Sequence, residues 1–431
     1  MAQNLKARLA QIRNLKMPDH KEVVRHKQLH NDPTAPKTVP SRINKTWNEV
    51  AYKVLCRKLS FPFTIQSDLP PTLPRLIPDF YRDNQNTGSL VPLDRLLFFD
   101  LETTGLSGGA GTVAFLAAFG QFAGKISEKS NKTRLEITQF LLLDYPGEAD
   151  FISQILSIIM PPDSSKPYFL VTYNGKAFDT QILKTRCLMN GMRLPEFFQI
   201  DLLHPARRLW KRLLPNCSQA TIETHILELD RSGDIPGSMA PDIWFNFLRS
   251  GEQFSGAGKK SGGFSESSRA LQQICDHNTK DIFGLATLFK AFIEIAASPN
   301  IAAAHFSCDE EALAINWKND PLYDQLLEAA AKNYPRSCLR RSFNLFRNGN
   351  CEEARKELQR IVNKTDWKVP CTESLQAIAL RSLAIDAQRR LGQADIALNY
   401  LEQAIGLREF LPDGLINDLE IRREKLLNIS G

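Results

Sequence analysis

The amino-acid sequence predicts two kinds of structure, an α/β domain followed by an all-α domain. Up to residue 297, short apolar runs that end at turn residues alternate with helical patterns, as expected for the strands and helices of an α/β domain. From residue 309 to the end, apolar residues recur at helical spacing throughout. The chain has 431 residues, 43% of them hydrophobic, which is enough for two or three soluble domains.

The composition argues against two classes of protein. The longest purely apolar run, residues 113–119, is far shorter than the roughly 20 residues that a membrane-spanning helix needs. The eight cysteines include no C-x-x-C pair, so neither a zinc or redox motif nor a small disulfide-bonded domain is indicated. We therefore expect a cytoplasmic protein with no membrane partner.

Positive charge is concentrated near the start of the chain. Residues 1–60 contain 13 Lys and Arg against four Asp and Glu, a net of +9, whereas the whole chain carries +6. Residues 1–18 combine apolar and basic residues at helical spacing, with Leu5, Leu9, Ile12 and Leu15 among Lys6, Arg8, Arg13 and Lys16. Such a helix either contacts nucleic acid or docks on the protein itself. The absence of Ser before Ser41 argues against an organelle-targeting peptide.

Proline content suggests where the first domain begins. Five prolines between residues 61 and 78 predict an extended linker, because proline disrupts helices and central strands. Residues 1–85 are therefore expected to form a basic segment and a Pro-rich linker. The α/β domain is expected over 86–297 and the helical domain over 305–431.

Two acidic residues follow the first predicted strand of the α/β domain. The run Leu96–Phe99 is apolar, and Asp100 and Glu102 come directly after it, two residues apart. Side chains alternate along a strand, so both carboxylates project from the same face. Their repulsion and desolvation would be relieved by a hard divalent cation. The alternative is that Asp100 begins a turn and Glu102 is solvated.

Further strands and helices follow in order. The patterns predict strands over 112–122, 135–143, 168–173 and 197–201, and helices over 149–160, 202–213 and 269–297. The glycine-rich residues 107–111 lack the Gly-Lys-Ser/Thr of a phosphate-binding loop and are expected to join two strands of a hairpin. Residues 250–268, rich in Gly and Ser, are expected to form a flexible surface insertion.

Three more residues could complete a metal site. Asp179 stands between the strand at 168–173 and a helical pattern, where it serves either as a helix N-cap or as a third carboxylate. His277 and Asp281 lie four residues apart in the long helix, hence on one helix face. Alone, this His/Asp pair would indicate only a weak ion pair. His204, in the helix at 202–213, is interpreted as structural.

The helical domain contains a weak internal repeat. Residues 348–355 resemble 391–398, with Gly349 and Gly392, and Ala354 and Ala397, offset by 43 positions. In each copy one helix is predicted to end at the glycine and the next to begin with a small residue packed on its partner. The pattern resembles tetratricopeptide-type helical pairs, which usually recur every 34 residues, with an insertion near 364–370.

The acidic residues appear in a characteristic order. Asp100, Glu102, Asp179, His277 and Asp281 resemble the pattern of the DEDD 3'-5' exonuclease superfamily, and specifically its YprB-like group. The motifs that carry this resemblance are FFDLETTGLSGGAGTVAFLAAFG, VTYNGKAFDTQ, DLLHPARR, DIPG and HNTKD, within residues 86–297. The resemblance implies a ribonuclease H-like fold, in which helices flank a mixed sheet.

The resemblance also implies a reaction, the hydrolysis of phosphodiester bonds in single-stranded DNA or RNA with two Mg²⁺ or Mn²⁺ ions. Asp100 would contact both ions, Glu102 and Asp281 would hold one, and Asp179 would support the other. His277 would accept a proton from the attacking water. By the same resemblance, Thr103, Thr104, Gly105 and Asn174 would contact the substrate. Superfamily members with a histidine base typically place it five residues before the final Asp, whereas here the spacing is four.

A second class of function is a scaffold, in which the repeats bind a protein partner and the nuclease-like domain only binds nucleic acid. The four acids argue against it, because negative charge facing a phosphate would weaken binding in a domain with no bound cation.

Overall fold

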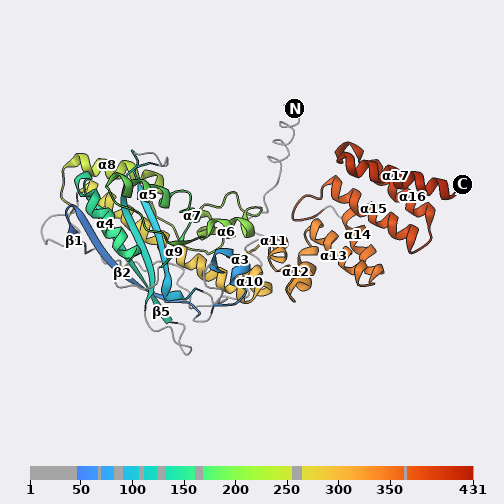
Figure 1. Cartoon of the computed structure of the whole chain (residues 1–431), viewed down its shortest axis with the longest axis horizontal. Helices are drawn as coiled ribbons and strands as arrows, with labels where there is room; N and C mark the ends of the chain where they lie inside the picture. The colour runs from blue at the N-terminus through green and yellow to red at the C-terminus, as the bar shows by residue number, and fades with distance from the viewer. Residues whose placement is uncertain are drawn as a thin grey trace.

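The computed structural model describes residues 46–66, 69–81, 91–105, 111–123, 132–160, 168–254, 265–363 and 366–430. An α/β part and a helical part follow one another along the long axis of the molecule (Figure 1). The predicted basic helix over residues 1–18 lies outside the described residues, as do most of the glycine-rich turn and of the Gly/Ser-rich insertion.

A mixed sheet forms the centre of the α/β part. Its order is β1-β2-β5-β4-β3-β6-β7. Neighbours are antiparallel from β1 across to β3, whereas β3, β6 and β7 run parallel. The strands span Asn48–Ala51 (β1), Val54–Thr64 (β2), Leu96–Thr103 (β3), Ala114–Ala123 (β4), Lys132–Leu142 (β5), Phe169–Thr172 (β6) and Phe198–Asp201 (β7). The five strands predicted from the sequence correspond to β3 to β7.

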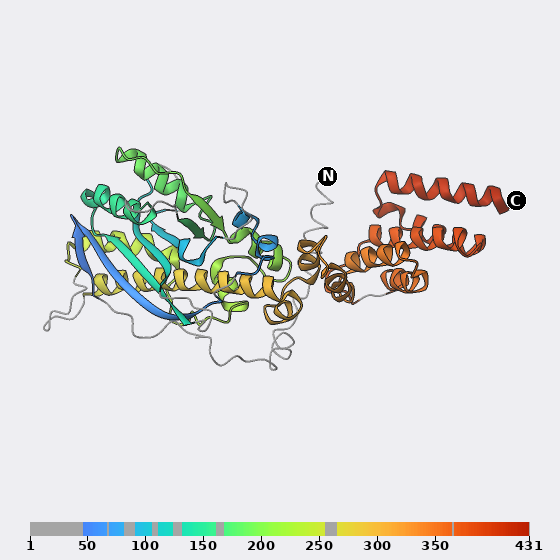
Figure 2. The ribbon, with the colours of Figure 1, turned by 60° about the horizontal axis from the view of Figure 1, so that its bottom comes forward.

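Helices cover both faces of this sheet, as Figure 2 shows for the long helix α9. The helices of this part are α3 (Leu73–Leu76), α4 (Glu148–Ile159), α5 (Asp179–Met189), α6 (Leu203–Trp210), α7 (Gln219–His225), α8 (Ala240–Ser250) and α9 (Glu266–Ala297). Alternation along β3 places Phe98 against Phe289 of α9, with ring centroids 6.0 Å apart, whereas Phe99 stacks on Phe119 on the opposite face. Asp100 and Glu102 share the face of Phe98 and therefore point toward α9.

The structure corrects the predicted Pro-rich linker. Residues up to Thr64 are not linker, because β2 pairs with β5 along its whole length and Pro62 lies opposite Arg134. Proline is tolerated in strands with an open edge, since its missing N–H then costs no ladder hydrogen bond. On the other side of β2, β1 pairs only with Val54 to Cys56, so no strand of the described residues pairs with Pro62 on that side.

The helical part follows α9 directly. Its helices are α10 (Pro299–His305), α11 (Glu310–Asn316), α12 (Tyr323–Ala331), α13 (Pro335–Arg347), α14 (Cys351–Asn363), α15 (Glu373–Arg389), α16 (Ala394–Ile405) and α17 (Asp413–Ser430). The mixed sheet with flanking helices, followed by this helix-rich region, confirms the predicted fold class. No helix among the described residues is both long and apolar enough to cross a membrane.

The internal repeat corresponds to two helix–turn–helix units, α13–α14 and α15–α16. Gly349 and Gly392 both adopt positive φ, 85° and 66°, in the turn between the paired helices. This left-handed conformation favours glycine. Ala354 and Ala397 are both fully buried near the start of the second helix. Membership of the tetratricopeptide family stays a prediction.

One hydrophobic cluster joins the α/β part to the first helices of the helical part. It contains Phe98 and Phe289, but also Trp317 and Tyr334, which lie beyond the predicted boundary. The indole N–H of Trp210 in α6 donates to the carbonyl of Phe306, 2.9 Å away. We therefore propose that α10 to α12 belong to the α/β domain and that the helical domain begins near residue 335.

Candidate metal centre

The acidic end of β3 is tied to α9 by amide side chains. The Nδ2 atom of Asn278 donates to Oδ2 of Asp100 at 2.7 Å. The Oδ1 atom of Asn278 in turn accepts a 2.8 Å hydrogen bond from the buried Gln139 of β5. Asn278 follows His277 directly in the sequence, so these bonds fix the turn of α9 that carries the histidine against the strand that carries the acids.

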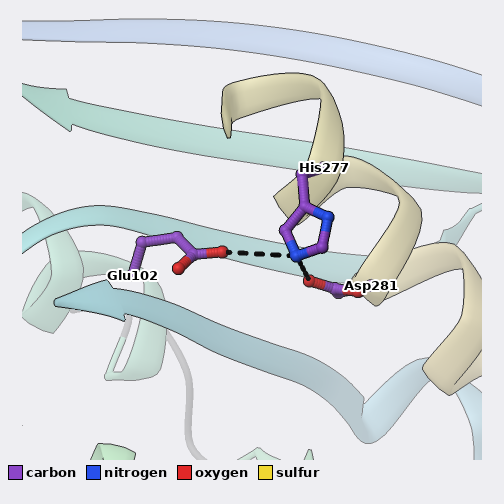
Figure 3. Close-up of side chains that lie close together, drawn as sticks. All are labelled: Glu102, His277 and Asp281. Carbon is purple, nitrogen blue, oxygen red and sulfur yellow. Dashed lines mark ion pairs between the residues drawn. The ribbon is translucent and has the colours of Figure 1, made fainter. Parts of the chain in front are cut away.

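Glu102, His277 and Asp281 form the closest group of possible metal ligands among the described residues. One donor atom from each lies within 4.8 Å of the other two. The Nε2 atom of His277 is 3.2 Å from Oδ2 of Asp281 and 4.0 Å from Oε1 of Glu102 (Figure 3). The four-residue spacing in α9 therefore directs the imidazole to the acidic end of β3.

Asp100 and Asp179 are not members of this group. Both are close enough for electrostatic repulsion, because the charges of Asp281, Asp179 and Glu102 all act on the Asp100 carboxyl. Asp179 is the first residue of α5, and the N-cap residue is Phe178 without a side-chain capping bond, so the N-cap interpretation of Asp179 is wrong.

The four predicted substrate-contact residues lie at the ends of β3 and β6. These strands are parallel neighbours, so their carboxyl ends share one edge of the sheet. Thr103 donates through Oγ1 to the carbonyl of Gly105 at 2.9 Å, and Thr104 Oγ1 accepts from the backbone N–H of Val113 at 2.9 Å. Asn174 has φ 64°, and its backbone N–H donates to Asp201 at 2.8 Å.

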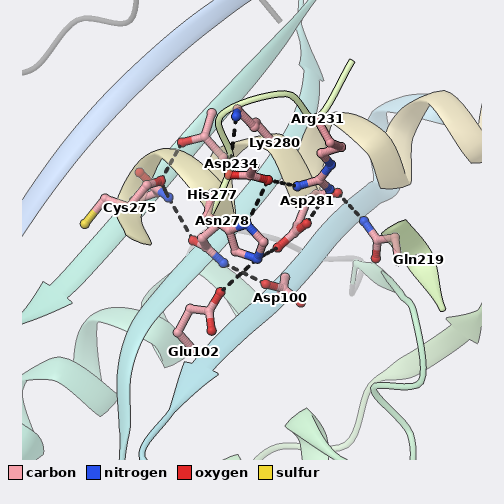
Figure 4. Close-up of polar contacts among 12 residues, drawn as sticks. Asp100, Glu102, Gln219, Arg231, Asp234, Cys275, His277, Asn278, Lys280 and Asp281 are labelled. Atoms are coloured by element: carbon pink, nitrogen blue, oxygen red, sulfur yellow. Dashed lines mark hydrogen bonds and ion pairs between the residues drawn. The ribbon is translucent and has the colours of Figure 1, made fainter. Parts of the chain in front are cut away.

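A second carboxylate holds the other side of the histidine ring. The Nδ1 atom of His277 lies 2.9 Å from Oδ2 of Asp234, which leaves Nε2 facing Glu102 and Asp281 (Figure 4). A Cβ atom built on Gly237 would come within 3.2 Å of this Nε2 atom. Asp234 and Gly237 are the first and last residues of the DIPG motif, so this motif both orients the ring and leaves room for it.

Arg231 links three carboxylates beside the centre. It lies 2.7 Å from Asp234 and 2.5 Å from Oδ1 of Asp281, and it also pairs with the buried Glu223. Gly284 in α9 accommodates this arrangement, because a Cβ atom there would overlap the Glu223 carboxylate at 1.7 Å. Arg231 therefore contacts one oxygen of Asp281 and leaves the other oriented toward His277.

Burial and mutual repulsion make the acids of the centre reluctant to ionise. Burial, followed by the charge of Asp281, raises the pKa of Glu102 to about 8. Burial, followed by the charge of Asp201, raises the pKa of Asp179 to about 7. Burial alone would lower the pKa of His277, but the hydrogen bond that its Nδ1 donates to Asp234 and the nearby negative charges raise it to about 9. The centre thus carries unbalanced negative charge whenever its acids are ionised.

These shifts predict that the metal-free protein loses stability as pH rises from about 5 to 9. In the unfolded chain Glu102 and His277 titrate near 4.5 and 6.5, so in this range the folded state binds more protons. Stability then falls as pH increases. The pKa of Asp234 is lowered instead, so the titration of this residue changes the stability only at pH values below this range. Melting temperatures measured in EDTA across this pH range test the prediction, with Glu102→Gln as the variant that should flatten the curve. A wild-type melting temperature that stays constant would contradict it.

Comparisons with known proteins agree with this geometry. A family model described as the RNase_H superfamily matches residues 97–293, from β3 into α9. This match covers less than half of the chain, includes the strand and helix that carry the centre, and supports a nuclease-type function. The chain is also 35% identical over 199 residues to an uncharacterized protein of Bacillus subtilis (strain 168) named YprB. That match covers 46% of this chain and 41% of the relative, so it concerns less than half of either protein.

Sequence reasoning did not assign Asp234 and Arg231 to the centre. The sequence signal for Asp234 was the DIPG motif, which contributed to the family resemblance but was not assigned to the metal centre. Asp234 and His277 are 43 positions apart, and Arg231 and Asp281 are 50 apart, so local spacing does not reveal these contacts.

Proposed function

We propose that the protein is a metal-dependent 3'-5' exonuclease that hydrolyses single-stranded nucleic acid with two Mg²⁺ or Mn²⁺ ions. The observation that carries the proposal is the convergence of Glu102, His277 and Asp281 within 4.8 Å, next to Asp100. The ribonuclease H superfamily match supports the nuclease class.

The donor atoms suit hard divalent ions. Asp100, Glu102, Asp179 and Asp281 offer carboxylate oxygens, which Mg²⁺ and Mn²⁺ prefer to sulfur ligands. The raised pKa values of the first three indicate that their negative charge is not balanced within the chain. The residues therefore fit a metal centre, and the four carboxylates would hold the ions. Bound ions would supply charge stabilisation for an in-line displacement at phosphorus.

Side chains and backbone of the protein would perform the other steps, which are proton transfer and substrate positioning. His277 would accept a proton through Nε2, since its Nδ1 atom is held by Asp234. The hydrogen bond to Asp234 and the charges of Asp281 and Glu102 raise the pKa of His277; bound cations would offset the charges of Asp281 and Glu102 and so favour the neutral imidazole that a proton acceptor needs. Gly105 would let a substrate approach the backbone closely. It has no positive φ, and a Cβ atom there would meet only Thr112 at 3.5 Å, so the fold itself does not require glycine.

The test is direct. Purified full-length protein is incubated with Mn²⁺ and single-stranded DNA or RNA labelled at either the 5' or the 3' end. A 3'-5' exonuclease should release the 3' label as a mononucleotide and leave a ladder of shortened 5'-labelled products. Binding without cleavage of either substrate would instead favour the scaffold function, with the helical domain available to a protein partner.

A further inference from the structure

Helix α6 separates buried apolar residues from exposed basic ones. Leu203, Ala206, Leu209 and Trp210 are buried in the domain core. The exposed positions of α6 and the turn after it are His204, Arg207, Arg208, Lys211 and Arg212, and residues 202–214 contain no acid. The segment thus presents a basic face to solvent, which begins within the motif DLLHPARR and contains none of the proposed metal ligands.

Only some of these basic side chains are engaged by the fold. Arg208 donates to the carbonyl of Leu76 at 2.6 Å, and Arg212 pairs with Asp309 at 2.5 Å. Arg207 and Lys211 form no ion pair with a carboxylate of the described residues. They are four residues apart, so their Cα atoms lie about 6 Å apart along the helix axis. Two positive charges with no carboxylate partner in the part of the chain that the structure describes therefore line one side of α6 and its C-terminal end.

This pair lies near the edge of the sheet that carries the metal centre. Tyr173 follows β6 directly, and its hydroxyl donates to the carbonyl of Cys217 at 2.6 Å. Burial raises the pKa values of Tyr173 and Cys217, and the charge of Arg207 opposes both shifts. Two residues after Cys217, the Nε2 atom of Gln219 donates to the backbone carbonyl of Asp281 at 2.7 Å. Helix α6 begins two residues after Asp201, the last residue of β7, and β7 ends at the same edge of the sheet as its parallel neighbours β6 and β3, so the basic face lies beside the edge that carries the centre.

We propose that Arg207 and Lys211 form a phosphate-contact surface that holds the backbone of a single-stranded nucleic acid as it enters the metal centre. The inference rests on the proposed function and adds to it a binding surface outside the carboxylate cluster. Exposed, unpaired basic side chains bind phosphates by displacing counterions, which requires no base-specific contact. The carboxylates would repel an incoming polyanion, so positive charge beside them offsets that repulsion.

The experiment measures binding separately from cleavage. Full-length protein that carries Asp100→Asn is titrated with fluorescent single-stranded DNA and RNA in Mg²⁺ at several salt concentrations. Adding Arg207→Ala and Lys211→Ala should reduce the slope of log affinity against log salt by about 1.4, at about 0.7 per phosphate contact, and weaken binding about tenfold near 0.15 M salt. Arg207→Lys with Lys211→Arg keeps both charges and should retain the slope, which separates lost charge from misfolding.

A matched pair on another helix serves as the control. Arg336 and Arg340 of α13 have the same spacing and no ion pair with a described carboxylate, so replacing both by Ala should leave the slope unchanged. The proposal is overturned if R207A/K211A keeps the affinity and salt slope of the protein without these changes. It is also overturned if the control variant loses as much affinity and slope as R207A/K211A. A third contradicting outcome is that R207A/K211A affects only the binding of an acidic peptide. Weakened binding in R207A/K211A, with no cleavage by otherwise wild-type protein, would reject the exonuclease and leave the binding surface standing.

Discussion

Asp100→Asn is expected to abolish metal-dependent hydrolysis while the fold is retained. Removing one carboxylate that holds the ions removes transition-state stabilisation of several kcal/mol, which corresponds to at least about 10³-fold in turnover. Burial, followed by repulsion from Asp281, Asp179 and Glu102, raises the pKa of Asp100 well above its ordinary value. The neutral amide relieves that repulsion and can still accept the hydrogen bond from Asn278. Metal-free stability should therefore hold or rise.

The comparison requires turnover with Mn²⁺ and the melting temperature in EDTA, both measured on the same preparations. Asp324→Asn is the matched control, because Asp324 is an exposed acid on α12, outside the centre. It should retain wild-type turnover. If Asp100→Asn also retained wild-type turnover, the assignment of the metal centre would be wrong. A large fall in melting temperature would instead mean that the Asp100 carboxylate stabilises the fold.

His277→Ala is expected to lower turnover by about 10²- to 10⁴-fold, the usual range for loss of a general base. The Nε2 atom of His277 faces Glu102 and Asp281, whereas its Nδ1 atom is held by Asp234, so the ring is positioned to receive a proton on the side of the acids. Mn²⁺ affinity should change little, because the four carboxylates remain. Single-turnover cleavage and calorimetric Mn²⁺ titration separate the two effects.

His305→Ala is a suitable control for this variant, since His305 is exposed at the end of α10. The wild-type rate should rise with pH as His277 loses its proton, and the variant should lose that dependence. A reduction smaller than tenfold would mean that His277 only positions its neighbours. Loss of Mn²⁺ affinity in the His277 variant would indicate that the imidazole is itself a ligand.

Local patterns predicted the central strands well. The apolar run before Asp100 and the largely apolar residues 112–122 form strands, as does 135–143, where apolar and polar residues alternate before the final apolar residues. The placement of Asp100 and Glu102 on one face followed from alternation alone. The strand β2 was missed because proline was taken to exclude a strand, although pairing with β5 overrides that local preference.

The metal centre was only partly predictable. Residue type and order indicated Glu102, His277 and Asp281, which lie together in the structure. The positions of Arg231 and Asp234 depend on how the segment between α7 and α8 folds over α9, and spacing along the chain carries no information about that packing. The boundary proposed near residue 335 differs from the predicted one for a similar reason, because Trp317 and Tyr334 pack into a core formed mainly by earlier residues.

The position of α9 has a consequence for the synthesis of the protein. Asp100 and Glu102 leave the ribosome long before His277 and Asp281, because α9 is the last element of the centre along the chain. Until α9 is made and packs against β3, the nascent chain presents three of the four acids without the histidine, the fourth acid or Asn278. Contacts between distant segments also form slowly during folding. A growing chain beside messenger RNA therefore lacks the complete centre until nearly all of the α/β domain has been translated.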